Sequence, residues 1–140
     1  MEILDIKFNN FLGIEKSGNH KYIYKIQNKP DYLNHLETIH ASVEYAVCEA
    51  TSGYILQTSF PEFADTVVPI LRRSAIKYSK PAMTGIFSTG HIDEIRKEKF
   101  INDLRTKGRA LIEVNIELYD IEDKRILTAE FEWFVTMIDK

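Results

Sequence analysis

Hydrophobic and polar residues alternate most regularly near the C-terminus of the chain. Every second residue is apolar from 110 to 118, and the same alternation returns from 127 to 137. A period of two is the pattern of a strand with one buried face, and the IEDK segment at 121–124 joins the two runs as a turn. The pattern predicts a long antiparallel hairpin whose strands have about 10 residues, near the upper end of the usual range.

Residues 39–56 follow a helical period instead. Apolar and small residues occupy both sides of this predicted helix: Val43, Ala46, Val47, Ala50 and Tyr54 on one side, and Tyr45, Cys48, Ser52, Ile55 and Leu56 on the other. A helix that is apolar nearly all round is buried on several sides. The same helix carries Glu49, although a carboxylate is costly to bury. This conflict makes Glu49 a candidate functional residue.

The other predicted elements come before and after this helix in the sequence. A short helix is predicted over 4–11, followed by a hairpin of 14–15 with 22–26 around an SGN turn. After the long helix, strands are expected at 67–78 and 84–89. Asp93 then begins a polar helix that ends at Gly108, with Ile95, Phe100, Ile101 and Leu104 as its apolar stripe.

The order of these elements is α-β-β-α-β-β-α-β-β. A single antiparallel sheet curled around the apolar helix would bury it as its composition demands. We therefore expect an α+β fold in which a curled antiparallel sheet wraps around a long central helix. The chain has 140 residues and no Pro/Gly-rich linker, so one domain spanning 1–140 is the simplest interpretation.

Composition indicates where the protein works and which partners it lacks, but not which reaction it performs. The net charge is -3, which argues against a nucleic-acid partner, since such partners usually require a basic face. No apolar run is long enough to span a membrane. Cys48 is the only cysteine, and MEILDIKFNNF at the N-terminus does not have the layout of a signal peptide. These features indicate a cytoplasmic protein.

Several short motifs recur in a fixed order along the chain: FLGI at 11–14, NHLETIH at 34–40, Glu49 nine residues after His40, YSKPA at 78–82, and Gly108-Arg109 before the last hairpin. In this order and spacing they resemble the hotdog fold, and more narrowly the single-domain acyl-CoA thioesterases of the phenylacetate-pathway and 4-hydroxybenzoyl-CoA type. The resemblance implies a hotdog fold, thioester hydrolysis, and dimers or tetramers with shared sites. The chain departs from the family at Ala41 and Ser42, where the family has two glycines, at Glu37, where its loop has a glycine, and in a longer segment at 91–107.

Two groups on the central helix suit thioester hydrolysis. Glu49 would act as general base or nucleophile, and the amide of Ala41 at the helix N-terminus would stabilise the oxyanion. Eight residues separate them, or about 12 Å along a helix, so one helix cannot bring both to one carbonyl. Two antiparallel helices related by a two-fold axis can, which predicts a homodimer with sites at its interface, and a tetramer of two such dimers is a further option.

Other residues are expected around this centre. Asn34 and His40 would shape the loop and contact the thioester, and Ser42 lies at the same helix N-terminus. Ser52 stands about one turn after Glu49, so its hydroxyl could orient the carboxylate or the water. By the resemblance, Thr89, Gly90 and His91 would line the pantetheine path. Candidates for binding the CoA phosphates are Arg109, Lys80 and Arg73.

Alternatives remain open at this stage. A carboxylate such as Glu49 is often a helix-surface residue, and His40 suits a local hydrogen bond at the helix entry as well as it suits chemistry. The histidines show no metal-ligand spacing, so we expect no metal site, and no cofactor beyond a CoA thioester as substrate. The competing function is a non-catalytic hotdog module that binds acyl-CoA or a related ligand.

Overall fold

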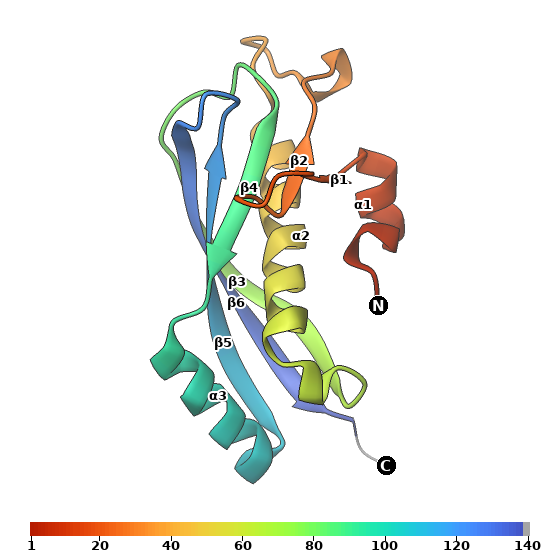
Figure 1. Cartoon of the computed structure of the whole chain (residues 1–140), viewed down its shortest axis with the longest axis vertical. Helices are drawn as coiled ribbons and strands as arrows, with labels where there is room; N and C mark the ends of the chain where they lie inside the picture. The colour runs from red at the N-terminus through yellow and green to blue at the C-terminus, as the bar shows by residue number, and fades with distance from the viewer. Residues whose placement is uncertain (139–140) are drawn as a thin grey trace.

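The computed structural model describes residues 1–138. In chain order the elements are η1 (Ile3–Asp5), α1 (Lys7–Leu12), β1 (Glu15–Lys16), β2 (Tyr24–Ile26), η2 (Pro30–Tyr32), α2 (Ala41–Ser59), η3 (Pro61–Phe63), β3 (Val67–Tyr78), β4 (Ile86–His91), α3 (Glu94–Lys107), β5 (Arg109–Tyr119) and β6 (Arg125–Met137). The six strands form one antiparallel sheet in the order β1-β2-β4-β5-β6-β3, and α2 lies against it (Figure 1). This is the hotdog fold, as the resemblance implied.

The β5-β6 hairpin confirms the alternating pattern. All five apolar residues of β5 that alternate from Ala110 to Leu118 are buried, and their neighbours on β6 include the buried Phe131 and Val135. Because successive side chains of a strand point to opposite faces, one face of this hairpin becomes the floor on which α2 packs.

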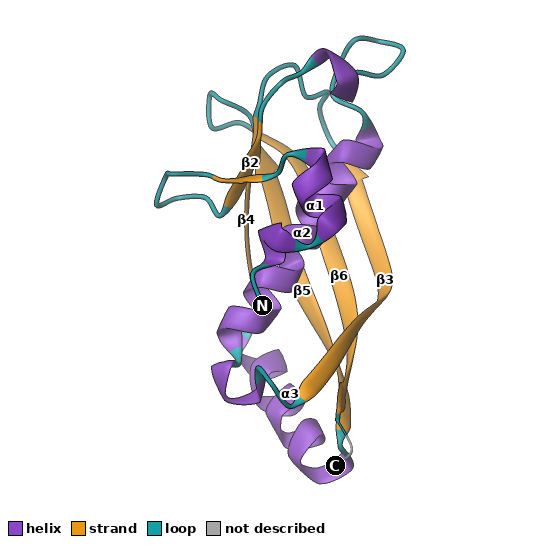
Figure 2. Ribbon diagram, turned by 90° about the vertical axis from the view of Figure 1, so that its right-hand side faces the viewer, coloured by secondary structure: helices purple, strands orange, loops and turns teal. Residues whose placement is uncertain are grey.

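Helix α2 is buried on several sides, as its composition predicted. Hydrogen bonds tie it to the sheet, among them one between the hydroxyls of Thr51 and Ser88 at 2.6 Å and one between those of Tyr45 and Ser74 at 3.0 Å. On the side away from the sheet, α1 and the N-terminal segment cover it (Figure 2). The helix is shifted along the chain from the predicted span, since it begins two residues later and continues to Ser59.

Helix α3 begins after Asp93 and ends at Gly108, as predicted, and Gly108 has the positive φ of 74° that favours glycine. Phe100 and Leu104 are buried, and the Phe100 ring lies 4.6 Å from that of Phe60 at the end of α2. The prediction for Ile95 was wrong, because its side chain is 81% exposed. Five residues separate Ile95 from Phe100, which places the two on different sides of a helix.

The N-terminal region differs most from the sequence prediction. The expected helix is divided into η1 and α1, and it exposes Phe8 and Phe11 while burying Asn9, whose side-chain amide donates to the Ile3 carbonyl oxygen at 3.0 Å. In the first hairpin, β1 is shifted by one residue from its predicted position and β2 has three residues instead of the five predicted. Strand β4 begins two residues later than expected. Periodicity had placed apolar residues on one face, but no other element covers that face in residues 1–138.

The two edges of the sheet are unequal. One edge is β1, which has two residues, and the other is the 12-residue strand β3. Within residues 1–138, β3 is paired with β6 on one side and has no strand on the other. Val68 and Ile70 on this free edge are 45% and 57% exposed. A long free edge with exposed apolar residues is a common site of pairing with another chain.

Candidate active site

The loop before α2 is held so that the helix begins at a defined residue. The amide of Ile39 donates to the Ala82 carbonyl oxygen at 3.0 Å, and the amide of His40 donates to the Tyr32 carbonyl oxygen at 2.7 Å. Asn34 stabilises the loop from inside, because its side-chain oxygen accepts from the amides of Leu36 and Thr38. The side chain of Asn34 is therefore engaged within its own loop.

His40 is the N-cap of α2. Its Nδ1 accepts a hydrogen bond of 2.9 Å from the amide of Ser42, so in the neutral ring the proton is on Nε2. The ring is exposed. The structure thus gives His40 the helix-entry role that the sequence had left open beside a chemical one.

Ala41 is the first residue of α2, and its N–H has no acceptor within residues 1–138. The next amide, that of Ser42, is capped by His40, and the amides of Val43 and Glu44 donate to the His40 carbonyl oxygen. Ala41 therefore provides the free donor at the positive end of the helix dipole, where a developing negative charge is stabilised.

Glu49 lies near the middle of α2 and lines a cavity. This Glu49 cavity has a volume of about 370 Å³, and its walls include Ile3, Phe60, Phe100 and Trp133. Burial raises the pKa of the Glu49 carboxyl above its ordinary value. A carboxylate that has lost part of its hydration in an apolar cavity is a stronger base than one on the surface.

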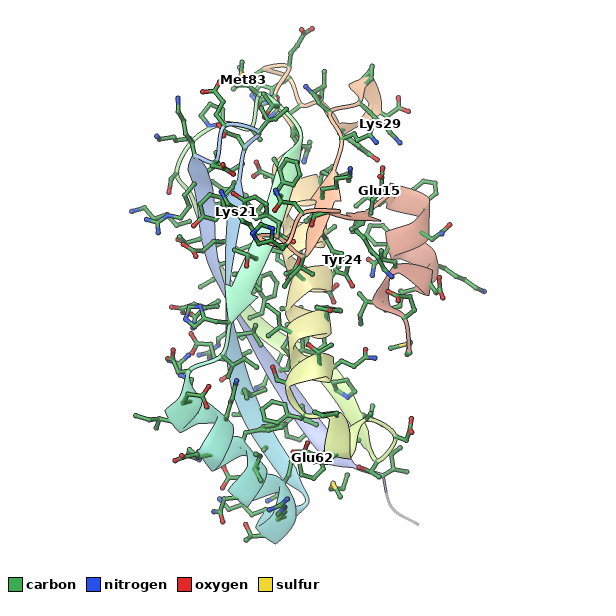
Figure 3. The ribbon with its side chains drawn as sticks, viewed as in Figure 1. Glu15, Lys21, Tyr24, Lys29, Glu62 and Met83 are labelled. Atoms are coloured by element: carbon green, nitrogen blue, oxygen red, sulfur yellow. The ribbon has the colours of Figure 1, made fainter. Side chains whose placement is uncertain are left out.

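Ala41 and Glu49 do not share a cavity. Ala41 lines a second space of about 230 Å³, the helix-entry cavity, together with Asn34, Glu44, Tyr78 and the segment 79–82. In Figure 3, Met83 marks the end of the molecule where this cavity lies and Glu62 marks the opposite end, beside Phe63 of the Glu49 cavity. Within one chain, Glu49, the candidate base or nucleophile, and Ala41, the candidate oxyanion donor, therefore lie in separate cavities.

Ser52 is completely buried and acts on the helix backbone. Its hydroxyl donates to the carbonyl oxygen of Glu49 at 2.8 Å and accepts from Nε1 of Trp133 at 3.0 Å. The bond is to the main chain of Glu49 and not to its carboxylate. Ser52 therefore fixes the helical turn that presents Glu49.

Thr89, Gly90 and His91, the residues predicted to line the pantetheine path, lie at the end of β4. Thr89 and Gly90 pair with β5, and an added Cβ at Gly90 would lie 2.2 Å from the Asn115 carbonyl oxygen. His91 is exposed, with its Nε2 3.6 Å from the carboxylate of Asp93, and it lines a groove over β3, β5 and β6. All three residues pair with β5, and because successive side chains of a strand point to opposite faces, Thr89 and His91 share one face of β4 while Gly90 lies on the other.

Arg109 lies in a basic groove that α3 helps to form. Arg72, Lys99 and Lys107 line the same groove, and so does Asp103, which is paired with both lysines. The hydrogen bond from Lys99 lowers the pKa of Asp103. The groove carries a net positive charge, and its basic residues come from β3, α3 and β5, so no local motif indicated it.

Glu44 is the residue that sequence reasoning missed. It is 4% exposed, and burial raises its pKa to about 7. A signal was present, because Glu44 precedes Cys48, Thr51 and Ile55 by four, seven and eleven residues, the spacing of one helix face. All three of those residues are buried.

Two further classes of site find no support in the described part of the chain. No group of three or more His, Cys, Asp or Glu residues in it could hold a metal ion. No helix within residues 1–138 has the length and apolar character needed to cross a membrane. Cys48 is buried, and burial raises the pKa of its thiol well above the ordinary value, so it is a core residue.

Known structures of similar fold come from several bacteria. A protein of unknown function from Pseudomonas aeruginosa, described as a probable thioesterase, superposes with a TM-score of 0.78 at 17% identity, covering 97% of this chain and 91% of that chain. A Bacillus halodurans protein with CoA gives a TM-score of 0.66 at 18% identity, covering 91% and 74%. A hypothetical thioesterase from Streptococcus pneumoniae with coenzyme A gives 0.60 at 16% identity, covering 84% and 79%. At these identities the similarity establishes the fold.

Sequence comparison identifies the family. No curated protein matches the chain. One family, described as a domain of unknown function (DUF4442), matches residues 16–135, which include α2, the helix-entry cavity and nearly the whole sheet. The chain belongs to the DUF4442 family.

Proposed function

We propose that the protein is an acyl-CoA thioesterase that works as a homodimer. In this proposal Glu49 of one protomer faces the N-terminus of α2 in the other, and two equivalent sites lie at the interface. The CoA thioester is the substrate, no other cofactor takes part, and the enzyme works in the cytoplasm. The observation that carries the proposal is the separation of Glu49 and Ala41 into two cavities.

Each half of the proposed site has the chemistry it needs. The free N–H of Ala41 at the helix N-terminus would polarise the thioester carbonyl and stabilise the oxyanion that forms from it. Glu49, whose pKa is raised by burial, would activate water or attack the carbonyl to give an anhydride that water then hydrolyses. Breakdown of the tetrahedral intermediate would release the CoA thiol and the carboxylic acid.

The helix geometry requires the second protomer. Eight residues of α2 separate the two groups by about 12 Å, whereas both must lie within about 3 Å of the reacting centre. Antiparallel packing of two α2 helices about a two-fold axis brings each Glu49 to the partner's helix N-terminus. The free β3 edge, with the exposed Val68 and Ile70, supports such an interface.

Relatives support the substrate class. Two of the proteins of similar fold are described with CoA, and two are described as thioesterases. The basic groove at Arg109 is a candidate for the CoA phosphates, because arginine binds phosphate through paired N–H donors. The competing function is that of a module that binds acyl-CoA and does not hydrolyse it.

Thiol release from a panel of acyl-CoA thioesters tests the activity. Wild type is expected to release thiol, and Glu49→Gln is expected to lose at least about 10²-fold in kcat while still binding CoA. Glu62→Gln, which changes an exposed carboxylate, is the matched control. CoA binding without release in wild type would establish the binding module instead.

A mixing experiment tests the shared site. Ala41→Pro removes the free N–H at a helix position that accepts proline, and the extended conformation of His40 (ψ 139°) is compatible with a following proline. Glu49→Gln and Ala41→Pro should each be inactive alone. After subunit exchange, about a quarter of wild-type activity should return, because half of the dimers are mixed and each has one intact site. No recovery despite exchange would show that each protomer acts alone.

A further inference from the structure

A second carboxylate on α2 is buried more deeply than Glu49. Helix α2 contains two acids, Glu44 and Glu49, and no basic residue. Glu44 is 4% exposed, and within residues 1–138 its carboxylate forms no hydrogen bond or ion pair. Side chains of this kind are rarely buried without a partner. Because Glu44 lines the helix-entry cavity, its unpartnered carboxyl is available to a ligand bound there.

The position of Glu44 on the helix directs it toward Ala41. The two residues are three apart, so they lie on neighbouring turns of one face. Side chains of an α-helix lean toward its N-terminus, and the Glu44 side chain accordingly covers the turn that Ala41 begins. Both residues line the helix-entry cavity of about 230 Å³. A ligand atom bound at the Ala41 N–H is within reach of the Glu44 carboxyl.

The other polar groups around this cavity are already engaged or lie at its rim. Asn34 is bonded within its loop, and the Tyr78 hydroxyl donates to the Ala41 carbonyl oxygen at 3.4 Å. Lys80, which follows β3, is exposed. On α2, Glu44 and the Ala41 N–H are the groups of this cavity without a partner in the described chain, while Ser79 and Lys80 lie at its exposed rim.

The surroundings of Glu44 favour its neutral form. Burial raises its pKa to about 7. Cys48 on α2 and Tyr78 on β3 lie near it, and burial raises the pKa of both. Lys80, beyond β3, lines the same cavity, and His40 stands four residues earlier at the helix entry. A neutral carboxylic acid has one O–H donor, which an ionised carboxylate lacks.

We propose that Glu44 is a catalytic residue that, as the neutral acid, donates a hydrogen bond to the carbonyl oxygen of the bound thioester beside the Ala41 N–H. This inference rests on the proposed thioesterase function and completes its oxyanion site with two donors. No proton is transferred. When Glu44 ionises, the donor is lost and a negative charge faces the oxygen, so ligand binding and turnover weaken.

Binding of an inert analogue tests this directly. The probe is a ketone analogue of acetyl-CoA in which a methylene group replaces the thioester sulfur, so it retains the carbonyl oxygen and cannot be hydrolysed. By titration calorimetry, the wild-type Kd should rise about tenfold from pH 6 to pH 8, as the neutral fraction of an acid with a pKa of about 7 falls. Glu44→Gln keeps an N–H donor at both pH values, so its Kd should not change.

Two further variants separate the donor from other effects. Glu44→Leu keeps the volume and removes the donor, and it should bind the analogue at least about tenfold more weakly than wild type at pH 6. His40→Asn keeps an N-cap acceptor and removes the imidazole, so it should retain the wild-type pH dependence. Melting temperatures of all variants establish that each is folded.

The outcomes distinguish this inference from the thioesterase proposal. The same pH dependence in Glu44→Gln as in wild type, or tight analogue binding by Glu44→Leu, would overturn the role of Glu44, even if Glu49→Gln abolishes thiol release. Analogue binding that depends on Glu44 in a protein that releases no thiol would establish the ligand contact and refute the thioesterase. No binding of the analogue by wild type at pH 6 would refute the inference as well.

Discussion

Trp133 on β6 donates a hydrogen bond of 3.0 Å from its indole nitrogen to the hydroxyl of Ser52 on α2. The same hydroxyl donates to the Glu49 carbonyl oxygen at 2.8 Å, so the sheet is connected through Ser52 to the turn that carries the candidate acid. All three groups meet in the interior of the fold, where an unpaired donor is costly.

Replacing Ser52 by alanine should therefore destabilise the protein by about 1–3 kcal/mol, because the indole N–H would remain buried without an acceptor. Urea unfolding followed by tryptophan fluorescence measures the loss. Thr58→Ala is the matched control, since Thr58 bonds the Tyr54 carbonyl oxygen on the exposed end of the same helix, and it should change stability by less than about 0.5 kcal/mol. Equal effects of the two changes would rule out a special role for the Trp133 bond.

Glu44→Gln should change how stability depends on pH. The pKa of Glu44 is raised from 4.5 to about 7, so the unfolded chain releases this proton at lower pH than the folded protein does. As the pH rises from about 4.5 past 7, the free energy of unfolding of wild type should fall by up to about 3 kcal/mol. The variant should not show this loss. Urea unfolding should give similar stabilities for wild type and Glu44→Gln at pH 4.5, and a more stable Glu44→Gln at pH 8. A variant that is less stable at pH 8 would contradict the assignment.

Two glycines give opposite predictions for the same substitution. In Gly90→Ala the new Cβ would lie 2.2 Å from the Asn115 carbonyl oxygen and 2.9 Å from Cδ1 of Ile55, so the protein should lose more than about 3 kcal/mol. In Gly53→Ala the closest contact is 3.6 Å, to Ile3, and alanine suits a helix interior better by about 0.5–1 kcal/mol. Thermal unfolding should lower the Tm of the first variant and raise that of the second.

Ile70→Lys should disrupt the proposed dimer without unfolding the protomer. Ile70 is 57% exposed on the free β3 edge, and a lysine there opposes strand pairing. Light scattering coupled to size exclusion should then give the mass of one chain, and thiol release should fall with it. Ile95→Lys, at a residue 81% exposed on α3, is the control and should remain dimeric. A dimer that persists in Ile70→Lys would locate the interface elsewhere.

The features that the sequence predicted well are those set by local periodicity. The β5-β6 hairpin and β3 were predicted because alternation or β-forming residues persist over ten or more positions. Helix α3 was predicted to begin after Asp93 and to end at Gly108, and it does so. In each case the residues that decide the structure are neighbours in the chain.

The features that it missed depend on what packs over a face. Periodicity grouped Phe8 with Phe11 and assigned Ile95 to the stripe of α3, but whether a face is covered depends on residues distant in sequence. Glu44 is the opposite case, since β3 and the segment after it bury a charged residue whose neighbours in sequence look ordinary. Arg109 likewise joins Arg72 and Lys99 only once the strands and α3 are assembled.

The contact between Phe60 and Phe100 has a consequence for how the proposed enzyme could change its substrate. Both rings line the Glu49 cavity, and Phe100 belongs to α3, the helix between β4 and β5. In the proposed enzyme, α3 would thus contribute a wall against which an acyl tail lies, while the reacting groups would be on α2. Selection and reaction would then be carried by separate pieces of the chain, so evolution could refit one ring to a new tail and leave the chemistry intact.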